Sequence, residues 1–189
     1  MSIGKTKLLF WMFIGCLFLT SCSKQDDIID YVPMKATNTI IGVCLSLQDT
    51  NGQPYSYEQL LSDKAFSVYG MQSKQPIPVS IVDVKELGEK RLKFDADLPD
   101  ARYMNFNSTH TNGEGFGLTR LTIDGSEVEL RFFFSYSQPE DKWMLANSGL
   151  SIELIYCNGV WVKPKSTKMF RYQLLTLRKN SKGGFDIVE

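Results

Sequence analysis

The chain has 189 residues, in which 21 lysines and arginines are balanced by 21 aspartates and glutamates, with one histidine. This balanced and interspersed charge gives no electrostatic basis for binding nucleic acid. The sequence contains no internal repeat and no low-complexity tract, so a single domain with one ordinary core is expected.

The N-terminus has the layout of an export signal. Lys5 and Lys7 precede an almost unbroken apolar run over residues 8–19, which two small residues and Cys22 follow. A transmembrane helix needs about 20 apolar residues, so this run is too short to span a membrane. We therefore expect residues 1–21 to be a signal peptide that is removed on export.

The end of this segment, Leu19-Thr20-Ser21-Cys22, resembles the lipobox of bacterial lipoproteins. The resemblance implies that Cys22 becomes an N-terminus carrying acyl chains such as palmitate. Each buried CH₂ group contributes about 0.8 kcal/mol, so two or more chains hold a protein firmly on a membrane. An ordinary signal peptide that is cut nearby is the alternative.

Ser23-Lys24-Gln25-Asp26-Asp27 follows the cysteine and resembles the stretch that follows it in surface lipoproteins of the Bacteroidota. This resemblance implies a lipid-anchored protein of the outer membrane, either displayed at the cell surface or facing the periplasm. Residues 22–38 are expected to be a flexible tether, in which Pro33 interrupts regular structure. Without residues 1–21, which hold two basic and no acidic residues, the net charge is −2.

Beyond the tether the pattern is β nearly throughout. In chain order, the expected strands are residues 39–47, 65–71, 79–85, 91–94, 103–108, 118–123, 127–136, 150–157, 160–163, 170–177 and 185–188, with one helical turn at 57–61. Asp124-Gly125 and Asn158-Gly159 are strong hairpin signals because these residue types tolerate positive φ. Short strands separated by regular turns predict that residues 39–189 form one all-β domain, an antiparallel β-sandwich of immunoglobulin-like or transthyretin-like type.

Two cysteines remain in the domain, Cys44 and Cys157. An oxidising compartment would allow them to form a disulfide. That bond would close a loop of over a hundred residues, which the chain-entropy account values at about 4–5 kcal/mol. The alternative is a pair of free thiols that behave as small apolar side chains.

Three aromatic residues fall outside the phase of the expected core and are candidates for ligand binding. Phe133 shares the polar face of its strand, Trp161 alternates against two valines, and Trp143 lies in or near a loop. Aromatic rings with polar neighbours can stack on a sugar or contact a partner protein. The alternative for Phe133 and Trp161 is a second buried face of the sheet.

No catalytic, metal or cofactor site is predicted. His110 lies in an expected loop without a recognised nucleophile beside it. Glu129 and Glu153 could form a pair of glycosidase carboxylates only at the right separation, which the sequence does not give. Residues 113–117 are glycine-rich but lack the lysine of a phosphate-binding loop, and are expected to be a mobile loop.

Three aspartates, Asp95, Asp97 and Asp100, alternate near a strand end and could supply oxygens to calcium. The turn glycine and the bidentate glutamate of a calcium loop are missing, so a solvated strand end is the default reading.

The whole layout resembles the small surface lipoproteins of the Bacteroidota. This resemblance implies an envelope location and a β-sandwich, but no particular activity follows from it. The main expectation is a non-catalytic binding or accessory role, with a glycan or an envelope protein as partner. The alternatives are an assembly partner that docks by strand addition and, less favoured, a small envelope hydrolase.

Overall fold

The computed structural model describes residues 36–139 and 148–188, and these residues are mostly β. The expected signal peptide, Cys22 and most of the expected tether lie outside the described residues, as does Trp143. The helical turn predicted at 57–61 is confirmed as α2 (Tyr57–Ser62), which Ser56 caps by accepting a hydrogen bond from the backbone N–H of Gln59. Within the described ranges, no helix is long and apolar enough to cross a membrane.

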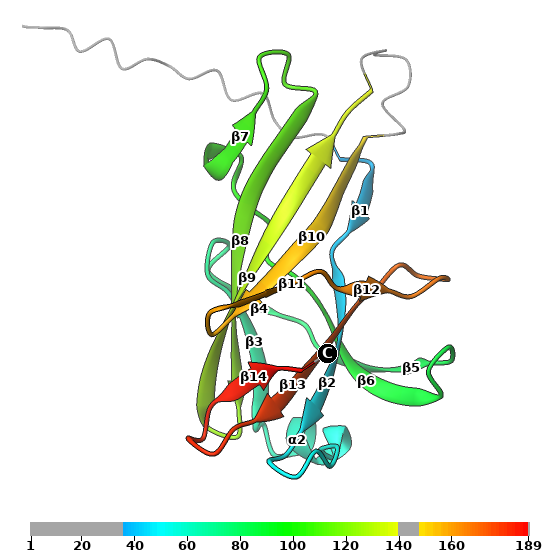
Figure 1. The fold of residues 1–189 in the computed structure, drawn as a ribbon, viewed down its shortest axis with the longest axis vertical. Coiled ribbons are helices and arrows are strands. Elements are labelled where there is room, and N and C mark those ends of the chain that lie inside the picture. Colours follow the sequence, from blue (N-terminus) through cyan, green and yellow to red (C-terminus); the bar gives the residue numbers. More distant parts are fainter. Residues whose placement is uncertain (1–35, 140–147, 189) are drawn as a thin grey trace, which may run out of the picture. The chain divides into compact units, whose positions relative to one another are not determined.

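Two β-sheets contain the strands (Figure 1). Sheet A has the order β1 (Asn38–Ile40), β10 (Gly149–Cys157), β9 (Ser126–Ser137), β8 (Asn112–Ile123), β3 (Phe66–Gly70) and β4 (Gln75–Ile77), with β11 (Val160–Val162) on β10 and β7 (Met104–Phe106) on β8. Sheet B has the order β12 (Lys165–Ser166), β13 (Gln173–Lys179), β2 (Gly42–Gln48), β6 (Glu89–Asp95) and β5 (Ser80–Val84), with β14 (Phe185–Ile187) on β13.

Purely antiparallel sheets were expected, and this is wrong at one pair in each sheet. β1 runs parallel to β10 and β2 runs parallel to β13. The expected strand over residues 39–47 breaks at Ile41, which lets β1 join sheet A and β2 join sheet B. Because side chains alternate with period two in both kinds of ladder, the pattern alone does not encode the direction of the neighbouring strand.

The inner faces of the two sheets form one hydrophobic core. The alternation predicted for β9 is confirmed, because its inward residues are at most 4 % exposed: Val128, Leu130, Phe132, Phe134 and Tyr136. Full burial of a large apolar side chain contributes about 1.5–3 kcal/mol. The core therefore fixes which face of β9 points to solvent.

Both predicted two-residue hairpin turns are confirmed. Asp124 and Gly125 have φ angles of 49° and 76° between β8 and β9, and Asn158 and Gly159 have 46° and 89° between β10 and β11. Positive φ at both central residues gives the turn the twist of its flanking strands.

The glycine-rich stretch of residues 113–117 is part of β8, and its prediction as a mobile loop is wrong. Gly113, Gly115 and Gly117 lie at inward positions of β8, where other chain segments approach the backbone closely. A Cβ on Gly117 would lie 2.1 Å from the backbone oxygen of Asp97. Glycine weakens the strand signal in the sequence, but here it makes room for a crossing segment.

Candidate functional site

Four aromatic residues on the outer face of sheet A form a continuous cluster, which we call the aromatic patch: Phe116, Phe133, Tyr156 and Trp161. The ring centroids are 5.2 Å apart between Phe116 and Phe133, 6.1 Å between Phe116 and Trp161, and 4.9 Å between Tyr156 and Trp161. Phe116 is 44 % exposed and Trp161 is 43 % exposed, so the patch meets solvent.

Strand register accounts for the aromatic patch. Phe116 on β8 is directly opposite Phe133 on β9, and Tyr156 on β10 is directly opposite Trp161 on β11. Directly opposed residues share a face of the sheet and interact. The Trp161 ring lies next to Phe116 although β9 and β10 stand between β11 and β8 in the order of the sheet.

A groove of about 610 Å³ adjoins the aromatic patch and shares Phe116 with it. We call it the sheet A groove; it is lined by Met71, Gln72, Lys74, Asp100, Arg102, Tyr103, Phe116, Leu118 and Arg131. β8 pairs with β7 up to Gly115 and with β3 from Thr119 onward. The groove therefore lies where neither strand covers the side of β8.

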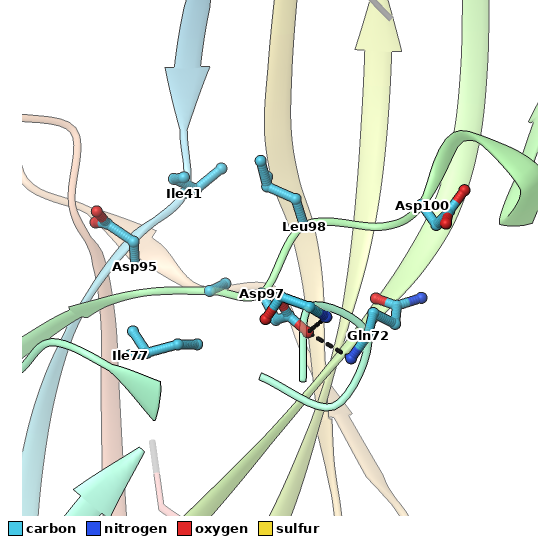
Figure 2. Close-up of a pocket in the computed structure, with 9 residues that line it drawn as sticks. Ile41, Gln72, Ile77, Asp95, Asp97, Leu98 and Asp100 are labelled. Atoms are coloured by element: carbon cyan, nitrogen blue, oxygen red, sulfur yellow. Dashed lines mark hydrogen bonds between the residues drawn. The ribbon is translucent and has the colours of Figure 1, made fainter. Parts of the chain in front are cut away.

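The turn after β3 forms one wall of the groove and is held by hydrogen bonds. The Asp97 carboxylate accepts from the backbone N–H groups of Gln72 at 2.7 Å and Ser73 at 3.1 Å. The side-chain amide of Gln72 donates to the backbone oxygen of Phe116 at 2.9 Å. Figure 2 shows the Asp97 side chain directed at this turn. These contacts fix the wall against β8.

Three cations and one carboxylate line the sheet A groove, which gives it a net charge of +2. Arg102 pairs with Asp100 through several hydrogen bonds of 2.6–3.1 Å. These hydrogen bonds lower the pKa of the Asp100 carboxyl to about 2. The Arg131 guanidinium carbon lies 5.7 Å from the centroid of the Tyr156 ring, a cation–π contact.

The three aspartates considered for calcium have other partners. Asp97 binds the turn, Asp100 pairs with Arg102, and Asp95 lies 2.8 Å from the Lys93 ammonium. In Figure 2 the side chains of Asp95 and Asp100 lie on opposite sides of Asp97. They line a second hollow of about 440 Å³. Among the described residues, no group of three or more His, Cys, Asp or Glu side chains could hold a metal ion.

The residues considered for catalysis are not brought together. Glu129 is opposite Arg120, whereas Glu153 sits at a bulge opposite Phe133, so about four residues, or ~13 Å, separate them along the sheet. Retaining and inverting glycosidases hold their carboxyl groups within about 10 Å. His110 is exposed in the turn before β8, where its ring packs on Phe106.

Cys44 and Cys157 are free thiols in the structure, which is the second alternative considered for them. Cys44 lies on β2 of sheet B and Cys157 on β10 of sheet A. Both are buried, and burial raises the pKa of each thiol to about 11. Neutral, inaccessible thiols are unreactive, so neither belongs to the candidate site.

Of the three aromatics singled out in the sequence, Phe133 and Trp161 meet in the aromatic patch. Phe133 is half-buried, while Trp161 is exposed. Sequence reasoning missed Phe116, Tyr156 and Arg131 as members of the same site. Phe116 and Leu118 alternate with glycines in the sequence. This alternation could have indicated that both side chains lie on the outer face.

Comparisons with known proteins give no further guide to the site. No family model matches the chain, and neither the curated proteins nor the solved structures include a significant match to it.

Proposed function

We propose that this protein binds polysaccharide, without catalysis, on the outer face of sheet A. The observation that supports this most strongly is the aromatic patch, in which rings from four strands, two of them exposed, adjoin a groove with polar walls. The C–H face of a sugar ring packs well on the electron-rich face of an aromatic ring. A cluster of exposed apolar side chains with a polar rim is also typical of an interaction site.

The sheets themselves can support such a role. We propose that the two sheets form a β-sandwich of immunoglobulin-like or transthyretin-like type, modified by the two parallel pairs. On such a scaffold the outer positions of a strand are free of core packing. Rigid strands hold the rings in place, so a sugar polymer would not have to order a loop in order to bind.

The location is part of the proposal and depends on the N-terminal sequence. We propose that Cys22 carries the lipid anchor in the outer membrane and that the domain faces the outside of the cell. The test is protease treatment of intact cells that express the wild type, Cys22→Ala or the pair Asp26→Ala/Asp27→Ala. Cleavage of the wild type with protection of the acidic variant supports surface display; protection of the wild type argues for the periplasmic face.

Binding itself is tested with the full-length protein in detergent by affinity electrophoresis through gels that contain defined polysaccharides. Stacking on one ring contributes about 1 kcal/mol, so Trp161→Ala or Phe116→Ala is expected to weaken binding several-fold to tenfold. Phe170→Ala is the matched control, since Phe170 is 63 % exposed and lies outside the patch. Equal retardation of all three variants and the wild type would contradict the proposal.

An envelope protein is the alternative occupant of the same surface, and the experiment distinguishes it. A protein partner would be captured from envelope extracts in a way that depends on Trp161, while no polysaccharide retards the wild type.

A further inference from the structure

The sheet A groove and the aromatic patch are parts of one surface. Phe116 belongs to both, and Arg131 lines the groove while its guanidinium lies over Tyr156 of the patch. A sugar ring that packs on Phe116 therefore places its substituents next to the cations of the groove. The identity of those substituents is where specificity would arise.

Two of the groove cations have unused donors. Among residues 36–139 and 148–188, the Arg131 side chain makes no hydrogen bond, and its nearest carboxylate oxygen, on Glu129, is 3.8 Å away. A guanidinium has five N–H donors, and 3.8 Å is too long for a hydrogen bond. Lys74, in contrast, has no ion pair with another described residue and lies in the turn after β3, with φ of 55°. Arg102 differs, because Asp100 already neutralises it.

We infer that the site selects acidic polysaccharides, whose carboxylate or sulfate groups bind Arg131 and Lys74 while their sugar rings pack on Phe116 and Trp161. This inference rests on the proposed function. An arginine fork binds a planar carboxylate or a sulfate through two parallel hydrogen bonds. A neutral polysaccharide would offer the rings the same contact but would bring no anionic group to Arg131 and Lys74.

The cation–π contact gives Arg131 a further property. The contact with the Tyr156 ring favours one position of the guanidinium without using its N–H donors. A cation that is held in place loses less conformational freedom on binding than a free one. Arg131 is thus the principal anion contact and Lys74 the second.

The test uses pairs of ligands that differ only in charge, with the full-length protein in detergent. Polygalacturonate is compared with its fully methyl-esterified form, and dextran sulfate is compared with dextran. We expect the acidic member of at least one pair to bind at least tenfold more tightly, with a preference that falls as salt rises because salt screens exposed charges. Preference within the first pair identifies a carboxylate ligand; preference within the second identifies a sulfate.

The variants test whether the acidic ligand binds at Arg131 and Lys74 or is attracted by any positive charge on the surface. Arg131→Gln/Lys74→Gln should lose at least tenfold in affinity for the acidic ligand and become indifferent to charge. Lys182→Gln, which removes an exposed charge in the β13–β14 turn, should bind like the wild type.

Failure of the inference and failure of the proposed function give different results. If the wild type binds charged and neutral polymers equally, and Trp161→Ala weakens both, the acidic preference is wrong and the polysaccharide function stands. If the double variant keeps its preference, the assignment of Arg131 and Lys74 is overturned. If the wild type binds none of the four polymers, both proposals are contradicted.

Discussion

The outer faces of the two sheets differ in what lies on them. On sheet A, the aromatic patch meets solvent and adjoins an open groove. On sheet B, Cys44 points outward from β2 and yet is fully buried, and Arg91 is only 8 % exposed. The segment around Pro164 lines a pocket together with Arg91 and Leu174, so the chain covers part of this face itself. Outward alternation alone therefore does not identify a functional surface.

The two outward arginines show the difference at the level of single residues. Arg91 donates to the backbone oxygens of Cys44 and Leu175 at 3.3 and 3.4 Å and to Glu89 at 2.6 Å. Arg131 lies against a ring and makes no hydrogen bond to a described side chain or backbone group. The first arginine serves the fold, and the second is available to a ligand.

The largest expected effect concerns the segment that borders the sheet A groove. Gly117→Ala would place a Cβ 2.1 Å from the backbone oxygen of Asp97. The position of a Cβ atom is fixed by the backbone, so no rotamer relieves this contact; we expect a loss of about 3 kcal/mol in the free energy of unfolding, measured by urea denaturation. Gly149→Ala is the control, because its Cβ would lie 3.6 Å from Asn38. A stable Gly117→Ala protein would show that the crossing segment can move away.

The two arginines can be compared by the same exchange. Arg91→Met leaves two carbonyl oxygens on sheet B without this donor and should cost about 2 kcal/mol. Arg131→Met should cost about 0.5 kcal/mol or less, since its side chain is 45 % exposed and makes no hydrogen bond to a described residue. Both values come from urea denaturation. Similar losses in the two variants would remove the distinction between the faces.

Thiol labelling tests whether the outer face of sheet B is inaccessible to solvent at Cys44. We expect a maleimide to leave Cys44 unmodified in the folded protein at pH 8 and to modify a cysteine introduced by Leu118→Cys in the sheet A groove at least a hundred times faster. Mass spectrometry of labelled peptides gives both rates. Rapid labelling of Cys44 would mean that the segments packed over it open readily.

The raised pKa of Cys44 also predicts a dependence on alkaline pH. Because its folded pKa is about 11 and its ordinary value is 9.0, its contribution to stability is complete below pH 9 and is lost as pH rises from 9 to 11. The urea midpoint should therefore fall more steeply across this window in the wild type than in Cys44→Ala. If the urea midpoints of the two proteins fell equally with pH, the raised pKa of Cys44 would be contradicted.

The smallest effect is expected at the edge of sheet B. The Glu86 carboxylate accepts hydrogen bonds from the backbone N–H groups of Lys168 and Met169 at 2.9 and 3.0 Å, and these bonds lower its pKa. Glu86→Gln should mainly speed hydrogen exchange of those two amides. In the wild type the protection of these amides should decrease as pH falls below about 4.5, the ordinary pKa of a glutamate. A carboxyl group with a lowered pKa contributes its full stabilisation only above that ordinary pKa. Unchanged exchange rates would contradict this clamp.

Sequence reasoning predicted the β class, α2, both two-residue hairpin turns and the inward face of β9, because each of these depends on local signals. It did not predict the parallel pairs or the glycine-rich half of β8, which depend on segments distant in the chain. For the site, Phe133 and Trp161 were identified by their phase. Their meeting with Phe116 and Tyr156 depends on strand register across the sheet, which no single strand encodes.

The parallel pairing of β1 with β10 has a mechanical consequence. Thr37 and Asn38 donate backbone hydrogen bonds to the Ser148 oxygen at 3.2 and 3.0 Å, and β1 then pairs with β10 over three positions. If the chain is held at Cys22, as proposed, a pull from a bound polymer travels from Trp161 through β11 and β10 into β1 and the tether. Sheet A would then carry this load along its strands, where several hydrogen bonds share it, while sheet B stays outside the direct line of force.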